Sequence, residues 1–138
     1  DAVQSQETSN PCSVSQKAAL AGLSGPDDFI EEMVAEYDRR RKYMTNRLNS
    51  MDGVTCLMPE GAFYVFPDVS ATYGRSYKGK MIAGSAVFCD YMLEECKIAI
   101  IPGGGFGADK YVRFSYATSM ANIEKALDRF EAGLKALE

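Results

Sequence analysis

The side chain best suited to chemistry is Arg113, which lies in an alternating segment of the chain. Over residues 111–116, one face of the predicted strand carries Val112, Phe114 and Tyr116, and the other carries Tyr111, Arg113 and Ser115. A guanidinium held on a strand presents its donors in a rigid fork that matches a carboxylate. We therefore expect Arg113 to bind a carboxylate. The alternative is a solvated arginine on the outer face of an edge or half-covered strand.

A glycine-rich turn, residues 102–107, precedes this strand and follows another apolar segment, residues 98–101. Its spacing Gly103-x-Gly105-x-x-Ala108 has the form of a dinucleotide-binding fingerprint. That motif works only where a helix begins, because the pyrophosphate is bound by the N–H groups of the first helical turn. Here a strand follows instead, so we predict a tight strand connection rather than a nucleotide site.

Composition limits the classes of function. The chain has 138 residues, 46% of them hydrophobic, which is ordinary for one globular domain. Its net charge of -4 argues against nucleic acid or an anionic membrane surface as partner. No apolar run is long enough for a membrane span. The start of the sequence lacks both Met and the features of a signal peptide. We therefore expect a fragment or processed product of a cytoplasmic protein.

Histidine is absent, and the four cysteines are Cys12, Cys56, Cys89 and Cys96. No Cys-x-x-Cys pair occurs, so we expect no metal site and instead predict reduced, mostly buried thiols. A Ser-His-Asp triad and an imidazole base are also excluded. Any general base must be a carboxylate, lysine, tyrosine or cysteine.

The periodicity predicts an α+β fold in the order α-α-β-β-α-β-β-α, with helices covering a small antiparallel or mixed sheet of about four strands. The expected helices are 13–22, opened by a capping box of Ser13 and Gln16, then 27–51, 85–96 and one capped by Ser119. The expected strands are 54–57, 62–66, 98–101 and 111–116. Residues 1–12 are predicted to be irregular, residues 68–82 to be a long mobile loop, and the basic run 39–42 to be a solvated helix flank.

Four segments occur in an order and spacing that resemble the C-terminal part of fold-type I, pyridoxal-phosphate-dependent aminotransferases of the aspartate aminotransferase family. They are TSNPCSVSQKAAL at 8–20, EGAFYVF at 60–66, PGGGFG at 102–107 and VRFSYA at 112–117. The resemblance covers nearly the whole chain. It implies a small domain, residues 13–138, that lacks the large cofactor-binding domain.

The resemblance also implies roles for particular residues. Arg113 would bind the α-carboxylate of the substrate, and Gly61, Ala62 and Phe63 would lie near it. Thr8, Ser9 and Asn10 would approach the active site of the partner subunit in a homodimer. The Schiff-base lysine belongs to an upstream Ser-x-x-Lys segment that this chain does not contain. We therefore expect no catalytic residue here, no pyridoxal phosphate bound to these residues alone, and no activity from them alone.

The implied reaction transfers an amino group from an amino acid to a 2-oxo acid, with aspartate and glutamate as the favoured pair. Relatives that use tyrosine, alanine or prephenate leave the substrate open. A different class of function also remains, namely a free-standing α+β module that binds a small molecule or acts as a regulator and dimerises through its sheet. In such a module Arg113 would bind an anionic effector or have no role.

Overall fold

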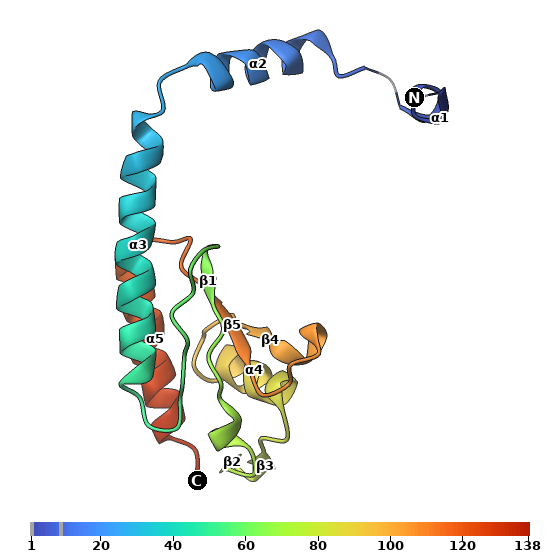
Figure 1. The fold of residues 1–138 in the computed structure, drawn as a ribbon. Helices are drawn as coiled ribbons and strands as arrows, with labels where there is room; N and C mark the ends of the chain where they lie inside the picture. Colours follow the sequence, from blue (N-terminus) through green and yellow to red (C-terminus); the bar gives the residue numbers. More distant parts are fainter. Residues whose placement is uncertain (1, 9) are drawn as a thin grey trace. The chain divides into compact units, whose positions relative to one another are not determined.

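A computed structural model describes residues 2–8 and 10–138, with only the backbone of Ser5 (Figure 1). It separates two compact units, Asp1–Met33 and Val34–Glu138. The mixture of helices and small antiparallel sheets confirms the predicted α+β class. The division into an N-terminal segment and a domain from residue 13 stays a prediction.

The first unit contains two short helices, α1 (Ala2–Glu7) and α2 (Ser13–Ser24). The expectation of irregular chain is therefore wrong over Ala2–Glu7. The described side chains of α1 are exposed, so the helix has no apolar stripe to reveal it, and its last turn is closed by Thr8, whose N–H and Oγ1 both donate to the Gln4 carbonyl at 2.9 Å.

The predicted capping box at the start of α2 is also wrong, because the helix is capped one residue earlier, at Cys12. The Gln16 N–H donates to the Cys12 carbonyl at 3.1 Å, and the Gln16 side-chain amide donates to the Pro11 carbonyl at 2.7 Å. In a capping box the Gln16 side chain would instead accept a hydrogen bond from the Ser13 N–H.

Helix α3 (Asp28–Asn49) has the predicted periodicity. Met44 and Leu48 are buried in the second unit, whereas Phe29 and Met33, in the first unit, are exposed. The basic run 39–42 is a flank of this helix, as predicted, because each of its four cations pairs with Glu36 or Asp38 on the same helix. Among the helices that the structure describes, none combines the length and apolar character needed to cross a membrane.

The main sheet has three antiparallel strands, β1 (Tyr64–Val65), β4 (Ile101–Pro102) and β5 (Val112–Ser115), in the order β1-β5-β4. The strand expected at 54–57 is reduced to a single bridge between Thr55 and Asp68. The cause is Asn49, whose side-chain amide donates to the Cys56 carbonyl and accepts from the Cys56 N–H, both at 2.8 Å. Those backbone groups are therefore not free to extend a ladder.

Residues 68–82 are not a loop without structure, so that prediction is wrong. They form a 3-10 turn (Ser70–Thr72) and a hairpin of β2 (Ser76–Tyr77) and β3 (Lys80–Met81). The hairpin turn is Lys78-Gly79, with φ of 49° and 79°, the sign that two-residue hairpin turns require. Val69, Thr72 and Ile82 are buried, which ties the segment into the core.

The core of the second unit lies between the sheet and the helices α4 (Ser85–Glu94) and α5 (Met120–Lys135). The predicted apolar stripe of α5 is confirmed over Ile123, Leu127, Phe130 and Leu134, which are all buried. Leu137, the last predicted member, is buried too but lies beyond the end of the helix. The Phe130 ring meets the Phe114 ring edge-on at 5.0 Å, which joins α5 to β5. Ser119 caps the helix as predicted, accepting from the Asn122 N–H at 3.3 Å.

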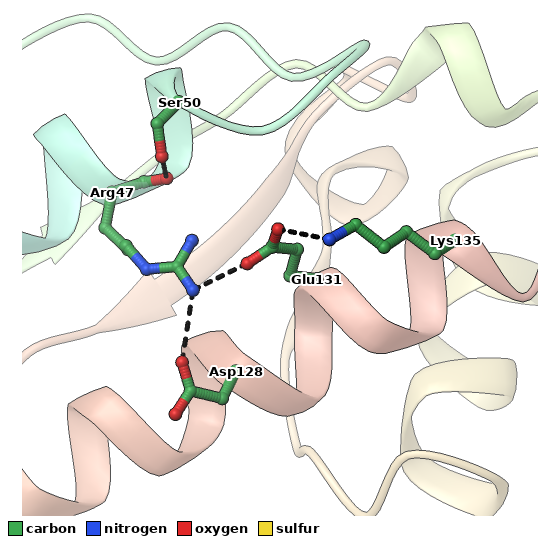
Figure 2. Close-up of polar contacts among 5 residues, drawn as sticks. All are labelled: Arg47, Ser50, Asp128, Glu131 and Lys135. Carbon is green, nitrogen blue, oxygen red and sulfur yellow. Dashed lines mark hydrogen bonds and ion pairs between the residues drawn. The ribbon is translucent and has the colours of Figure 1, made fainter.

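A polar cluster links the last turns of α3 to α5 (Figure 2). The Arg47 guanidinium lies 2.6 Å from a Glu131 oxygen and 3.1 Å from an Asp128 oxygen. Lys135 binds the other Glu131 oxygen at 2.6 Å, and the Ser50 hydroxyl donates to the Arg47 carbonyl at 2.7 Å. Arg47 of α3 thus forms ion pairs with two carboxylates of α5.

The four cysteines are free thiols. Cys56 and Cys89 are buried, Cys96 is half-buried and Cys12 is exposed. Burial raises the pKa of the Cys89 thiol to about 12. Burial is confirmed for two of the four thiols, Cys56 and Cys89, and the reduced state stays a prediction.

Candidate anion-binding site on the open face of the sheet

Arg113 lies on the central strand, β5, with its guanidinium held between two aromatic rings. The guanidinium carbon is 5.2 Å from the centre of the Tyr64 ring and 5.0 Å from that of Phe106. In the described part of the chain, no carboxylate, carbonyl or hydroxyl accepts a hydrogen bond from this guanidinium. Its donors are therefore available to a ligand, while the rings restrict where the side chain can lie.

The orientation of Arg113 follows from the strand on which it lies. Val112 and Phe114 are buried at 0% and 4% exposure, so the residue between them must point to the opposite face. This confirms the predicted alternation. Only the edge part of the alternative is wrong, because β5 pairs with β1 on one side and with β4 on the other. An arginine on a half-covered sheet is not contradicted, so the carboxylate role of Arg113 stays a prediction.

Tyr64 lies on the same face because β1 pairs with β5 in the register Tyr64↔Ser115. The segment just before it, residues 61–63, is held against the end of β5. The Tyr116 hydroxyl donates to the Ala62 carbonyl at 2.9 Å, and the Tyr116 N–H donates to the Phe63 carbonyl at 2.8 Å. The Phe63 ring then meets the Tyr64 ring edge-on at 5.7 Å.

Of the predicted substrate residues Gly61, Ala62 and Phe63, these contacts place Ala62 and Phe63 beside Tyr116 and Tyr64. Ala62 has a φ of 65°, a strained value for a residue with a Cβ. All three residues are exposed. Their contact with a substrate stays a prediction.

Phe106 reaches Arg113 from the glycine-rich turn, whose first part is a 3-10 helix (Gly103–Phe106). A Cβ on Gly103 would lie 2.2 Å from the Ala108 carbonyl oxygen and 2.4 Å from that of Tyr111, so only glycine fits there. The turn leads into β5, as predicted for a strand connection. The Phe66 ring braces the ring of Phe106 edge-on at 6.1 Å.

Sequence reasoning did not single out Tyr64 or Phe106. The alternation that buries Val65 already implied that Tyr64 points to the open face, so that signal was present. Phe106 lies in a turn, where no periodicity exists to indicate its direction. Thr8 and Asn10 are exposed residues of the first unit, Ser9 lies outside the described residues, and their approach to a partner's active site stays a prediction.

The lysines of the chain do not fit covalent attachment of pyridoxal phosphate. A lysine that forms an imine is desolvated or placed beside another cation, which lowers its pKa. Here every lysine side chain is exposed. Lys78 has its pKa raised instead, by its hydrogen bond to Glu95 and then by one to Tyr77. No step of a reaction is therefore assigned to a lysine of this chain.

The fold and this site together define an α+β domain that offers a preorganised guanidinium on the open face of its sheet. Residues 2–130 match the family model described as aminotransferase class I and II, and the chain belongs to that family. It is similar to the aspartate aminotransferase of Rhizobium meliloti, with 46% identity over 98% of this chain. It is 42% identical, over 92% of this chain, to the aspartate/prephenate aminotransferase of Nitrosomonas europaea.

Solved structures agree with these matches. The crystal structure of the Rhizobium meliloti aspartate aminotransferase superposes with a TM-score of 0.92 at 43% identity, over 99% of this chain and 34% of that one. The aspartate aminotransferase of Thermotoga maritima gives a TM-score of 0.77 at 37% identity, over 96% of this chain and 31% of that one. The chain spans about a third of the length of the curated relatives it matches, 33% and 32% for the two named above.

Proposed function

We propose that the protein containing this chain is a pyridoxal-phosphate-dependent transaminase, and that this chain is its substrate-carboxylate-binding small domain. The family membership and the relatives named aspartate aminotransferase support this proposal. Amino acids and 2-oxo acids are the substrates, with aspartate and glutamate favoured. The enzyme is a cytoplasmic homodimer, in which residues 8–10 approach the active site of the partner subunit.

We infer that the cofactor is held by a lysine outside these 138 residues, because each lysine of this chain is exposed. Pyridoxal phosphate, when bound, supplies the electron sink that makes the α-proton of an amino acid removable. The contribution of this chain is to bind and orient the substrate, which allows the Cα–H bond to be aligned with the cofactor.

The observation that carries the proposal is the guanidinium of Arg113, which has two aromatic neighbours and no acceptor among the described residues. An α-carboxylate can accept two parallel N–H bonds from such a fork. Because Tyr64 and Phe106 already restrict the side chain, little of its conformational freedom is lost when the ligand binds. Each hydrogen bond that involves a charged group contributes about 1.5–3 kcal/mol. Loss of the two together removes about 3–6 kcal/mol and is expected to lower kcat/KM by at least about 100-fold.

The test replaces Arg113 with Leu in the longer protein and measures kcat and KM for aspartate and glutamate. We expect KM to rise and kcat/KM to fall. Arg113→Lys keeps the charge but lacks the fork, so its kcat/KM should lie between those of the wild type and of Arg113→Leu. The matched control is Arg129→Leu, since Arg129 is an exposed arginine on α5. A wild-type kcat/KM in Arg113→Leu would refute the carboxylate role.

The reaction class has a separate test. Pyridoxal phosphate is added to the 138-residue chain and to the longer protein, and each is treated with borohydride and followed by absorbance. We expect a reducible Schiff base in the longer protein alone. A cofactor band in neither protein would contradict the transaminase and favour the regulatory module, in which Arg113 binds an anionic effector.

A further inference from the structure

A hydrogen-bonded junction lies where helix α4 begins. The residue before the helix, Gly84, has no side chain with which to cap it. The carboxylate of Asp109 takes that place, because its Oδ1 accepts from the Ser85 N–H at 3.2 Å and from the Ser85 hydroxyl at 2.6 Å. An acceptor at this position satisfies a free N–H of the first turn and complements the helix dipole.

The same junction holds the glycine-rich turn. The Ser85 hydroxyl, which is fully buried, accepts from the Gly104 N–H at 3.1 Å while it donates to Asp109. A Cβ on Gly104 would lie 3.0 Å from Asp109 Oδ1, and one on Gly84 would lie 2.8 Å from Oδ2. The carboxylate therefore lies close against the backbone of both Gly84 and Gly104. The Tyr73 hydroxyl also donates to the Asp109 carbonyl.

This turn ends at Phe106, one of the two rings that flank Arg113. The Phe106 side chain is 55% exposed, so burial alone does not determine where its ring lies. Among the described residues, the one aromatic ring that contacts the Phe106 ring is that of Phe66, edge-on at 6.1 Å. The position of the ring therefore depends on the backbone of residues 103–106, and the side-chain hydrogen bond to that backbone comes from Ser85.

From this chain of contacts we infer that Ser85 and Asp109 are positioning residues for carboxylate binding. They hold the 3-10 turn so that the Phe106 ring lies against the guanidinium of Arg113. This inference rests on the proposed function, because it assumes that Arg113 binds the substrate carboxylate. It adds two residues, neither of which touches the substrate, that determine how tightly the carboxylate is bound.

The experiment replaces Asp109 with Ala in the longer protein and measures kcat and KM for aspartate. Misplacement of a binding group by about 1 Å can cost about 100-fold, and a smaller shift of the ring is expected to raise KM about tenfold with kcat within about threefold of the wild type. Asp109→Asn keeps an acceptor oxygen and should restore KM. The control is Asp90→Ala, which removes an exposed carboxylate that belongs to α4 itself.

A double-mutant cycle separates positioning from general stability. In a Phe106→Leu background no ring remains to be positioned, so Asp109→Ala should change KM less than about twofold there. An undiminished effect in that background, or a wild-type KM in Asp109→Ala alone, would overturn the inference. If Asp109→Ala does not fold, Ser85→Ala is used in the same cycle, since it removes only the acceptor of the Gly104 N–H and a donor to Asp109.

The inference and the proposed function fail in different ways. If Arg113→Leu leaves kcat/KM unchanged, the carboxylate role of Arg113 is wrong and the positioning role is lost with it. If Arg113→Leu has the expected effect while the Asp109 cycle shows no coupling to Phe106, only the positioning role is wrong.

Discussion

Gly133 in helix α5 offers a sharp test of packing in the second unit. It is buried, and a Cβ added to it would lie 2.6 Å from the Cys96 sulfur and 3.2 Å from the Met92 methyl carbon. Replacing a helical glycine with alanine gains about 0.5–1 kcal/mol of backbone entropy, whereas overpacking a core costs about 1–3 kcal/mol. The steric cost exceeds the gain, so we expect Gly133→Ala to lower the free energy of unfolding by about 1–2 kcal/mol.

The contact with Cys96 dominates, because Met92 is flexible and its atoms lie at 3.2 and 3.3 Å. In a Cys96→Ala background the sulfur is absent, and Gly133→Ala should then lie within about 0.5 kcal/mol of neutral or stabilise the protein. The assay is urea unfolding followed by circular dichroism, with comparison of midpoints at unchanged m-value. Equal destabilisation in both backgrounds would refute the assignment of the clash to Cys96.

Two further predictions concern the helices. Ser119→Ala removes the N-cap of α5, whose hydroxyl accepts from the Asn122 N–H, and should cost about 1 kcal/mol in urea unfolding, with Ser119→Asp close to the wild type. Hydrogen bonds from Arg39 and then from Arg40 lower the pKa of Glu36 from 4.5 to about 2. The pKa of Glu36 is lower in the folded state than in the unfolded state. The stability that its charged carboxylate contributes is therefore complete above the unfolded pKa and is lost as the pH falls through about 2. The difference in unfolding free energy between the wild type and Glu36→Gln should therefore shrink from about pH 5 to about pH 2. A constant difference across that range would contradict the assignment.

Elements with one clear period could be predicted from the sequence. The alternation over residues 111–116 and the stripe of α5 each depend on a single buried face, and both appear as expected. Residues 54–57 and 68–82 could not be predicted in the same way. The conformation of residues 54–57 depends on the Asn49 side chain, and that of residues 68–82 on burial of Val69 and Ile82. Neither a side-chain hydrogen bond to the backbone nor contact with the core leaves a periodic pattern in the segment itself. Helix α1 was missed because its described side chains are exposed and carry no period.

For the site, the sequence by itself determined the chemistry and the face. Arg113 lies in a predicted strand between the apolar residues Val112 and Phe114. Because side chains alternate along a strand, this is sufficient to place the guanidinium on the open face of the sheet. Tertiary structure alone decided that this guanidinium lies between Tyr64 and Phe106 without an acceptor among the described residues, and that Asp109 caps a helix beginning 24 residues earlier. The physical reason is that strand register and turn geometry bring together residues far apart in the chain, and such contacts leave no periodic signal in any one segment.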